Sequence, residues 1–137
     1  MLECSPDGVV VVPGQPLRLL EVKCPVVMKN YDPKNFDTKM TKAQKQNCAL
    51  RKIGNHFMMK ASHSHHYQVQ MQMDIMNVHT CDYFVWTRHG HICVSVAYNE
   101  VFWAPKRNEL VTRHHQFLVP EYFLQRIPRD LPIYELA

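Results

Sequence analysis

A Pro13-Gly14 dipeptide between two apolar segments constrains the start of the fold more than any other feature of this 137-residue chain. Residues 8–12 before it are rich in valine, and residues 17–23 after it alternate loosely between apolar and polar side chains. Valine favours strands, and proline followed by glycine is a strong turn signal. We therefore expect two adjacent strands joined by a tight turn.

This pairing brings charged residues to neighbouring positions. Asp7 stands at the start of the first strand, and Glu21 and Lys23 lie towards the end of the second. Because side chains alternate along a strand, Glu21 and Lys23 share one face and Val22 points the opposite way. The sequence thus predicts that carboxylates from both strands lie close together.

Two neighbouring carboxylates suit a divalent cation. Asp7 and Glu21 would repel each other, and Mg²⁺ relieves such repulsion because it prefers oxygen ligands. The backbone carbonyl of Val22 would be a further oxygen ligand. Lys23 could hold an attacking water or neutralise charge on a phosphoryl oxygen, and together these groups could hydrolyse a phosphodiester. The same spacing also fits an edge-strand Glu–Lys pair with a turn aspartate, so both interpretations stay open.

Residues 26–60 form the basic part of the chain. Eight lysines and arginines there face only two acids, Asp32 and Asp37. Pro33 breaks the start of this segment, and we expect a helix over residues 38–53 with lysines on one side. The charge fits contact with DNA phosphates, and it fits a solvated helix face equally well.

The middle of the chain predicts one helix and one hairpin. Residues 66–78 carry apolar side chains without proline or glycine, which predicts a mostly buried helix that ends near Asn77. Residues 81–87 and 92–98 are apolar and flank a turn at residues 88–91, so we expect a pair of strands.

The C-terminal part predicts a further helix. Residues 99–122 supply apolar anchors that include Phe102 and Trp103. After Pro120 the chain is punctuated by prolines, and we expect it to be irregular.

Three other classes of protein find less support. Five cysteines, none in a C-x-x-C arrangement, indicate neither a disulfide framework nor a zinc ribbon. Histidines gather at residues 63–66 and 89–91, but their pairs do not recur with zinc-ligand spacing, and a zinc-binding interaction protein stays an alternative. Neither a membrane-length apolar stretch nor a signal peptide is evident. We expect an intracellular protein, in the nucleus or cytoplasm, with no membrane partner.

Four blocks of the chain resemble, in the same order, the YqaJ-like viral recombinase or lambda-type exonuclease family of the PD-(D/E)xK nuclease superfamily. These blocks are Ser5-Pro6-Asp7-Gly8, Leu19-Leu20-Glu21-Val22-Lys23-Cys24-Pro25, His66-Tyr67-Gln68-Val69-Gln70-Met71-Gln72-Met73 and Cys81-Asp82-Tyr83-Phe84-Val85-Trp86-Thr87. A later segment, residues 100–103, is similar to the family's segment after its last core strand. The resemblance therefore covers most of residues 4–103.

The resemblance implies an α/β fold with a restriction-endonuclease-like core, in which a central mixed β-sheet is flanked by helices. We expect this domain over residues 1–124, followed by a proline-containing tail over residues 125–137. In this family a helical part precedes the S-P-D-G block, whereas here the block follows almost at once. We therefore expect an N-terminally shortened version that lacks this helical part.

The resemblance also assigns roles to residues. Asp7 and Glu21 would be the metal-binding carboxylates, and the carbonyl of Val22 a further metal ligand. Lys23 would be the catalytic lysine, and Gln68 the helix glutamine that positions the water or the lysine. Gln70 is either a second such glutamine or a polar residue on a packed helix.

The function implied is a Mg²⁺-dependent deoxyribonuclease, with Mn²⁺ as a substitute, that acts as an exonuclease on linear double-stranded DNA ends in recombination or repair. DNA ends would be its partner, and a homo-oligomer around DNA is expected from the family. The alternative is a catalytically inactive DNA-binding or interaction module that retains the nuclease fold.

Overall fold

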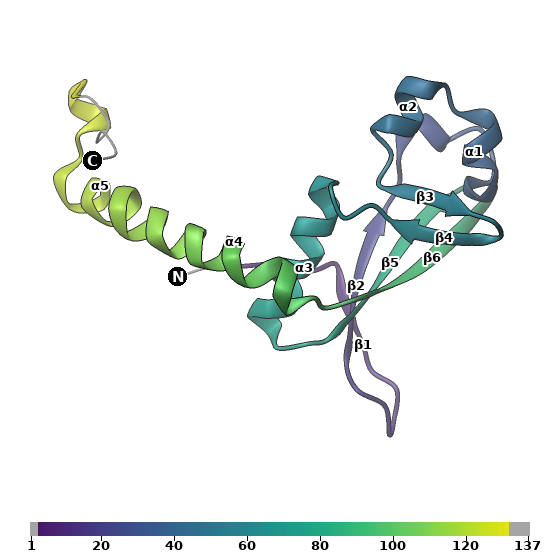
Figure 1. Cartoon of the computed structure of the whole chain (residues 1–137), viewed down its shortest axis with the longest axis horizontal. Coiled ribbons are helices and arrows are strands. Elements are labelled where there is room, and N and C mark those ends of the chain that lie inside the picture. The colour runs from purple at the N-terminus through teal and green to yellow at the C-terminus, as the bar shows by residue number, and fades with distance from the viewer. Residues whose placement is uncertain (1–2, 132–137) are drawn as a thin grey trace. The chain divides into compact units, whose positions relative to one another are not determined.

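The computed structural model describes residues 3–131 (Figure 1). The strands are β1 (Gly8–Val10), β2 (Arg18–Lys23), β3 (Leu50–Ile53), β4 (His56–Met59), β5 (Thr80–Thr87) and β6 (Gly90–Ala97). The helices are α1 (Phe36–Lys39), α2 (Lys42–Gln46), α3 (Ser64–Met76), α4 (Glu100–Arg113) and α5 (Val119–Leu124). Short 3₁₀ turns lie at Val26–Met28, Pro33–Asn35 and Ile127–Arg129, and a π-helical turn at His114–Leu118. The chain divides into one unit up to Asn99 and another from Glu100.

Within the described residues, four strands form a mixed sheet in the order β1-β2-β5-β6. The β2–β5 pair is parallel and the two outer pairs are antiparallel. The expected α/β fold with a mixed sheet is therefore confirmed, together with the hairpin at the start of the chain. Its connection contains a turn in which Gln15 N–H donates to the carbonyl of Val12 (3.0 Å) and Gly14 takes φ 76°. A positive φ at this turn position favours glycine, which explains the Pro-Gly pair.

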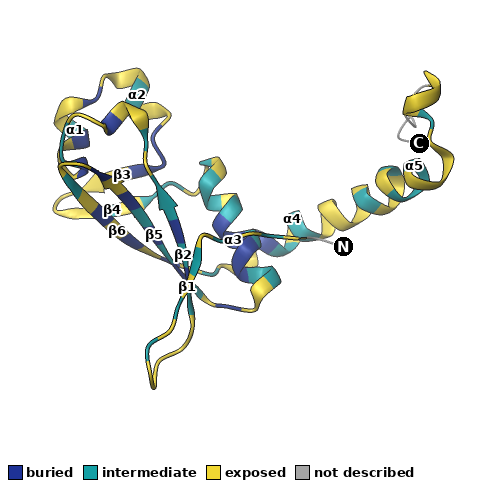
Figure 2. Ribbon diagram, turned by 180° about the vertical axis from the view of Figure 1, so that it is seen from behind, coloured by how far each residue is buried: buried dark blue, intermediate teal, exposed yellow. Residues whose placement is uncertain are grey.

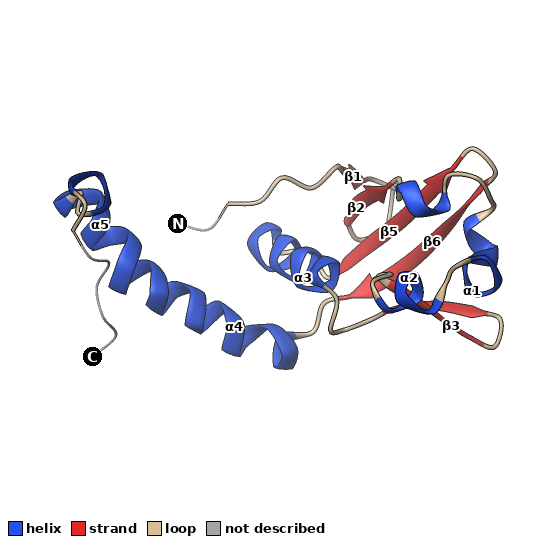
Figure 3. Ribbon diagram, turned by 90° about the horizontal axis from the view of Figure 1, so that it is seen from above, coloured by secondary structure: helices blue, strands red, loops and turns tan. Residues whose placement is uncertain are grey.

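Buried and less buried residues alternate along the strands of this sheet (Figure 2), so one face is buried and the other carries exposed residues. The buried side chains alternate along the strands, and the register brings Leu19 beside Cys81 and Glu21 beside Tyr83. Helix α3 packs against β5 on the buried side, as the view from above shows (Figure 3). Val69 and Met73 of α3 complete a hydrophobic core with these strands. Glu21 and Lys23 consequently project from β2 towards α3.

The segment 38–53, predicted as one helix, folds otherwise. Helix α1 ends at Lys39, because Met40 is extended, and Thr41 starts the short helix α2 with a reciprocal cap to Gln44. Strands β3 and β4 then form an antiparallel hairpin in which Ile53 pairs with His56. Glycine followed by asparagine between two apolar segments is a two-residue hairpin signal, and Gly54 has φ 58°. The helix prediction was wrong over β3 because it did not weigh this turn.

The other elements follow the predictions more closely. Helix α3 begins at Ser64, two residues before its predicted start, and ends at Met76, followed by Asn77 in the left-handed conformation expected of a helix C-cap (φ 52°). Strands β5 and β6 form the expected hairpin, with its turn at Arg88 and His89. Strand β6 begins at Gly90, earlier than predicted.

The C-terminal unit is helical, as predicted for residues 99–122. Helix α4 continues through the π-helical turn into α5, which runs four residues beyond Pro120 and so corrects the expectation of irregular chain there. Pro120 lies at the second position of α5, where the π-helical turn passes into the α-helix. Part of the predicted tail, residues 132–137, lies outside the described residues, as do residues 1–2 of the expected shortened N-terminus. Of the helices described, none is long and apolar enough to cross a membrane.

Candidate active site

The β1–β2 hairpin places Asp7 next to the strand that carries the other predicted site residues. Gly8 pairs with Leu20, so Asp7 continues the register towards Glu21. The Asp7 Oδ2 atom accepts a hydrogen bond from the backbone N–H of Val22 (2.7 Å). Asp7 is exposed, whereas Glu21 is only 2% exposed. Asp7 therefore lies on the solvent side of the strand whose buried carboxylate is Glu21.

Glu21 is a buried carboxylate that accepts hydrogen bonds from three side chains. Lys23 Nζ donates to its Oε1 atom in a close ion pair, and Gln68 Nε2 donates to the same oxygen (2.7 Å). Gln72 Nε2 donates to Oε2 (3.0 Å). Buried charge is costly unless it is paired and hydrogen-bonded, and these donors meet that requirement.

Lys23 bridges the carboxylate and the helix glutamine. Its Nζ atom also lies 3.4 Å from Gln68 Oε1, and its side chain is 27% exposed. The ammonium is therefore held in place from two sides while one part of it remains open to solvent. Of the residues predicted for the site, the structure brings Glu21, Lys23 and Gln68 into direct contact, with Asp7 bonded to the intervening Val22.

Gln72 is a site residue that the sequence reasoning missed, and Gln70 does not belong to the site. Gln68 and Gln72 are four residues apart, so they lie on one face of α3, whereas Gln70 lies on another. Gln70 is fully buried, donates to the carbonyl of Ala97 (2.9 Å) and accepts from the N–H of Asn99 (2.7 Å). The spacing of the glutamines along the helix is the sequence signal that would have distinguished Gln72, which belongs to the site, from Gln70, which does not.

Replacing Gln70 by alanine is expected to lower the free energy of unfolding by about 1–3 kcal/mol, because the buried amide's hydrogen bonds to the carbonyl of Ala97 and the N–H of Asn99 are lost. Urea unfolding of the purified chain measures this change. Gln46→Ala, at an exposed position of α2, is the matched control and should leave the unfolding midpoint nearly unchanged. Equal effects of the two substitutions would show that Gln70 does not link α3 to the end of β6.

The groups beneath Glu21 are kept neutral. Burial first, and then the negative charges of Glu21 and other acids including Asp7, raise the pKa of the Cys81 thiol to about 12. Burial also raises the pKa of Tyr83, whose hydroxyl shares a hydrogen bond with Nδ1 of His65. Because Cys81 is protonated at neutral pH, it is unsuited to act as a nucleophile. The site therefore offers carboxylates and an ammonium for its chemistry.

Acid is expected to destabilise the chain partly through His65. Burial, followed by the charges of His63 and Lys23, lowers the pKa of His65 below its usual 6.5. The folded state then binds fewer protons than the unfolded state, so the contribution of His65 is present above pH 6.5 and is lost as the pH falls below it. Wild type should lose more unfolding free energy than His65→Gln between about pH 7.5 and about pH 5.5 in thermal or urea melts. Parallel losses in the two proteins would contradict this assignment.

The oxygen atoms of this site are of the kind that a hard divalent cation prefers as ligands. A carboxylate offers about four lone-pair positions, and three donors occupy Glu21, which leaves capacity for one further bond. Oε1 of Gln72 is buried without a donor in residues 3–131, and is thus another oxygen acceptor beside Glu21. Asp7 and the carbonyl of Val22 are oxygen ligands of the type that Mg²⁺ prefers.

The arrangement as a whole places carboxylate and amide oxygens beside a fixed ammonium. In residues 3–131, no group of three or more histidine, cysteine, aspartate or glutamate side chains is placed to hold a metal, so the histidines at 63–66 do not gather into such a cluster. A scan of protein-family models, a search of curated proteins and a search of solved structures find no match to this chain.

Proposed function

We propose that the chain is a Mg²⁺-dependent deoxyribonuclease, with Mn²⁺ as a substitute, that hydrolyses phosphodiester bonds at the ends of linear double-stranded DNA. The observation that carries this proposal is the ion pair of buried Glu21 with partly exposed Lys23, held by Gln68 and Gln72 beside Asp7. An isolated structural ion pair needs no second carboxylate at its exposed edge. The ordered sequence blocks that resemble the lambda-type exonucleases support the same function.

In this mechanism Asp7, Glu21 and the carbonyl of Val22 would hold the cation. The bound ion would supply charge stabilisation and a lowered pKa for a bound water. Lys23 stabilises the negative charge that develops on the phosphoryl oxygens, because its ammonium is already fixed and partly desolvated. Gln68 holds Lys23 and Glu21 in that geometry with one amide, through Oε1 and Nε2 respectively. Gln72 fixes the second oxygen of Glu21 from the core side.

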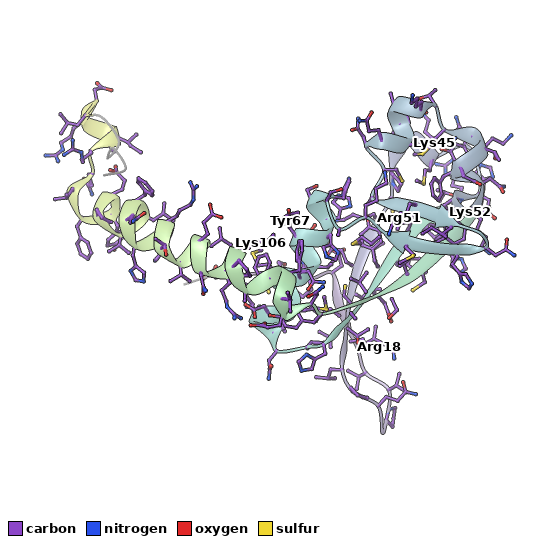
Figure 4. All side chains as sticks on the ribbon, viewed as in Figure 1. Arg18, Lys45, Arg51, Lys52, Tyr67 and Lys106 are labelled. Carbon is purple, nitrogen blue, oxygen red and sulfur yellow. The ribbon has the colours of Figure 1, made fainter. Side chains whose placement is uncertain are left out.

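A basic surface supports the choice of a polyanionic substrate. The segment between β2 and α3 exposes seven cationic side chains, namely Lys29, Lys34, Lys39, Lys42, Lys45, Arg51 and Lys52. Figure 4 shows Lys45, Arg51 and Lys52 over α2 and the β3–β4 hairpin. Asp37 offsets part of this charge through its ion pair with Lys52 (3.3 Å). Contacts of this kind bind phosphates without reading sequence, and they weaken as salt rises.

Digestion of end-labelled linear duplex DNA, with a closed circle of the same sequence as comparison, tests the proposed function. In Mg²⁺ the purified chain should degrade the linear DNA and leave the circle intact, and added salt should slow the reaction. Degradation of both forms would show a nuclease that does not need ends. A folded chain that degrades neither form would contradict the proposal.

The second candidate is an inactive DNA-binding module with the same fold. The observation in its favour is that Lys23, Gln68 and Gln72 already satisfy Glu21 within the chain. Such a module would bind linear duplex DNA in a salt-dependent manner and would leave it intact in Mg²⁺ and in Mn²⁺. The digestion experiment, run beside a binding measurement by fluorescence anisotropy, separates the two candidates.

A further inference from the structure

A cavity of about 300 Å³ lies beside Lys23. Strands β2 and β5 form its floor through Lys23 and Val85, while α2 contributes Ala43 and the start of α3 contributes His65. Small-molecule sites usually measure roughly 300–1,000 Å³, so this cavity is suited to one small group.

The lining is mainly apolar. Its side chains include Met28, Met40, Leu50 and Val85, each at most 5% exposed. Methionine thioethers make favourable contacts with aromatic rings. The imidazoles of His63 and His65 form one wall, edge to face with their centroids 4.5 Å apart. A flat, neutral, aromatic group fits this lining better than an ion or a sugar.

Lys23 belongs both to this lining and to the candidate active site. A phosphate held at its ammonium would place the attached nucleotide at the mouth of the cavity, and its base is a flat aromatic group of suitable size. Because Met28 and Met40 are at most 5% exposed, a base that contacts them has to leave the duplex stack.

We propose that this cavity binds one unpaired nucleobase of the strand whose phosphodiester lies at Lys23. This inference rests on the proposed nuclease function and adds a subsite to it. The base would leave the duplex end and insert between the methionines and the histidine wall. Its insertion would align the scissile phosphate with Lys23, so a missing base should slow cleavage.

Two substrates test the base subsite directly on the wild-type chain. A duplex with 2-aminopurine at its ends reports unstacking by a rise in fluorescence, measured with Ca²⁺ in place of Mg²⁺. A duplex with an abasic residue at the end nucleotide should be cleaved roughly tenfold more slowly in Mg²⁺ than an intact duplex, since the contacts of one base are lost. An abasic residue far from the ends should change nothing.

Filled-cavity variants supply the protein side of the test. Ala43→Phe adds a ring at an exposed position of the lining, and Val27→Phe does so at a second exposed position in case the first variant fails to fold. Ala97→Phe, at an exposed position of β6 outside the lining, is the matched control. The cavity variants should lose the fluorescence rise and cleave roughly tenfold more slowly, whereas the control should behave as wild type.

The outcomes separate this inference from the proposed function. If abasic ends and the filled-cavity substitutions both left the rate of end-dependent cleavage unchanged, the base subsite would be overturned. The proposed nuclease function would stand. A fluorescence rise that persists in Ala43→Phe and Val27→Phe would place the unpaired base elsewhere, and would also overturn it. A wild-type chain that neither binds nor cleaves DNA would overturn both proposals together.

Discussion

Replacing Lys23 by methionine is expected to slow DNA cleavage by roughly 10²–10³-fold, the usual effect of removing one preorganised group that stabilises transition-state charge. Methionine keeps the apolar stem but removes the ammonium that pairs with Glu21 and contacts Gln68. Gln68 and Gln72 still donate to Glu21, and circular dichroism checks that the variant folds although the buried carboxylate has lost its cation. Single-turnover cleavage of a labelled linear duplex in Mg²⁺ measures the effect.

The matched control is Lys29→Met, which removes an exposed lysine from the basic segment. It should weaken DNA binding slightly, more at low salt than at high salt, and leave the cleavage step unchanged, because a single phosphate contact acts on binding alone. If both variants lost the same activity, Lys23 would act only as a positive charge that binds DNA, and not in the cleavage step. If Lys23→Met cleaved as fast as wild type, its catalytic role would be refuted.

Replacing Leu19 by alanine should produce the largest loss of stability, about 2–5 kcal/mol. Leu19 is fully buried on β2 and pairs in register with Cys81 at the centre of the sheet. Truncation leaves a cavity beneath the same strand that carries Glu21 and Lys23. Because single domains are stable by only about 5–15 kcal/mol, much of the stability would be lost.

Leu17→Ala provides the comparison for this core substitution. Leu17 precedes β2 and is 50% exposed, so its loss should shift the urea midpoint little. Circular dichroism during urea unfolding gives both free energies. Similar values for the two variants would mean that β2 does not lie at the centre of the core.

The sequence predicted the local strand features because they depend on short-range chemistry. Period-two alternation correctly placed Glu21 and Lys23 on one face, and Pro13-Gly14 correctly marked the first turn. The parallel pairing of β2 with β5 depends on contacts across some sixty residues, as in the pair of Leu19 with Cys81, and no local pattern specifies it. The resemblance, rather than periodicity, implied a mixed sheet.

The errors have equally specific causes. A run of lysines at helical spacing outweighed the Gly54-Asn55 turn, so β3 was mistaken for the end of a helix. Gln72 was missed because the glutamines were compared as a motif rather than by their positions around α3. The burial of Glu21 could not be predicted from strand alternation, because it depends on which face α3 covers.

The dependence of cleavage on Mg²⁺ concentration, compared in wild type and Asp7→Asn, tests the central claim most directly. Asparagine can still accept the N–H of Val22 but lacks the negative charge that would bind a cation. Wild type should cleave linear duplex DNA in Mg²⁺ or Mn²⁺ and stop in EDTA, and Asp7→Asn should need a much higher Mg²⁺ concentration to reach half its maximal rate. Cleavage that persists in EDTA, or an unchanged Mg²⁺ requirement in Asp7→Asn, would contradict a metal site at Asp7 and Glu21.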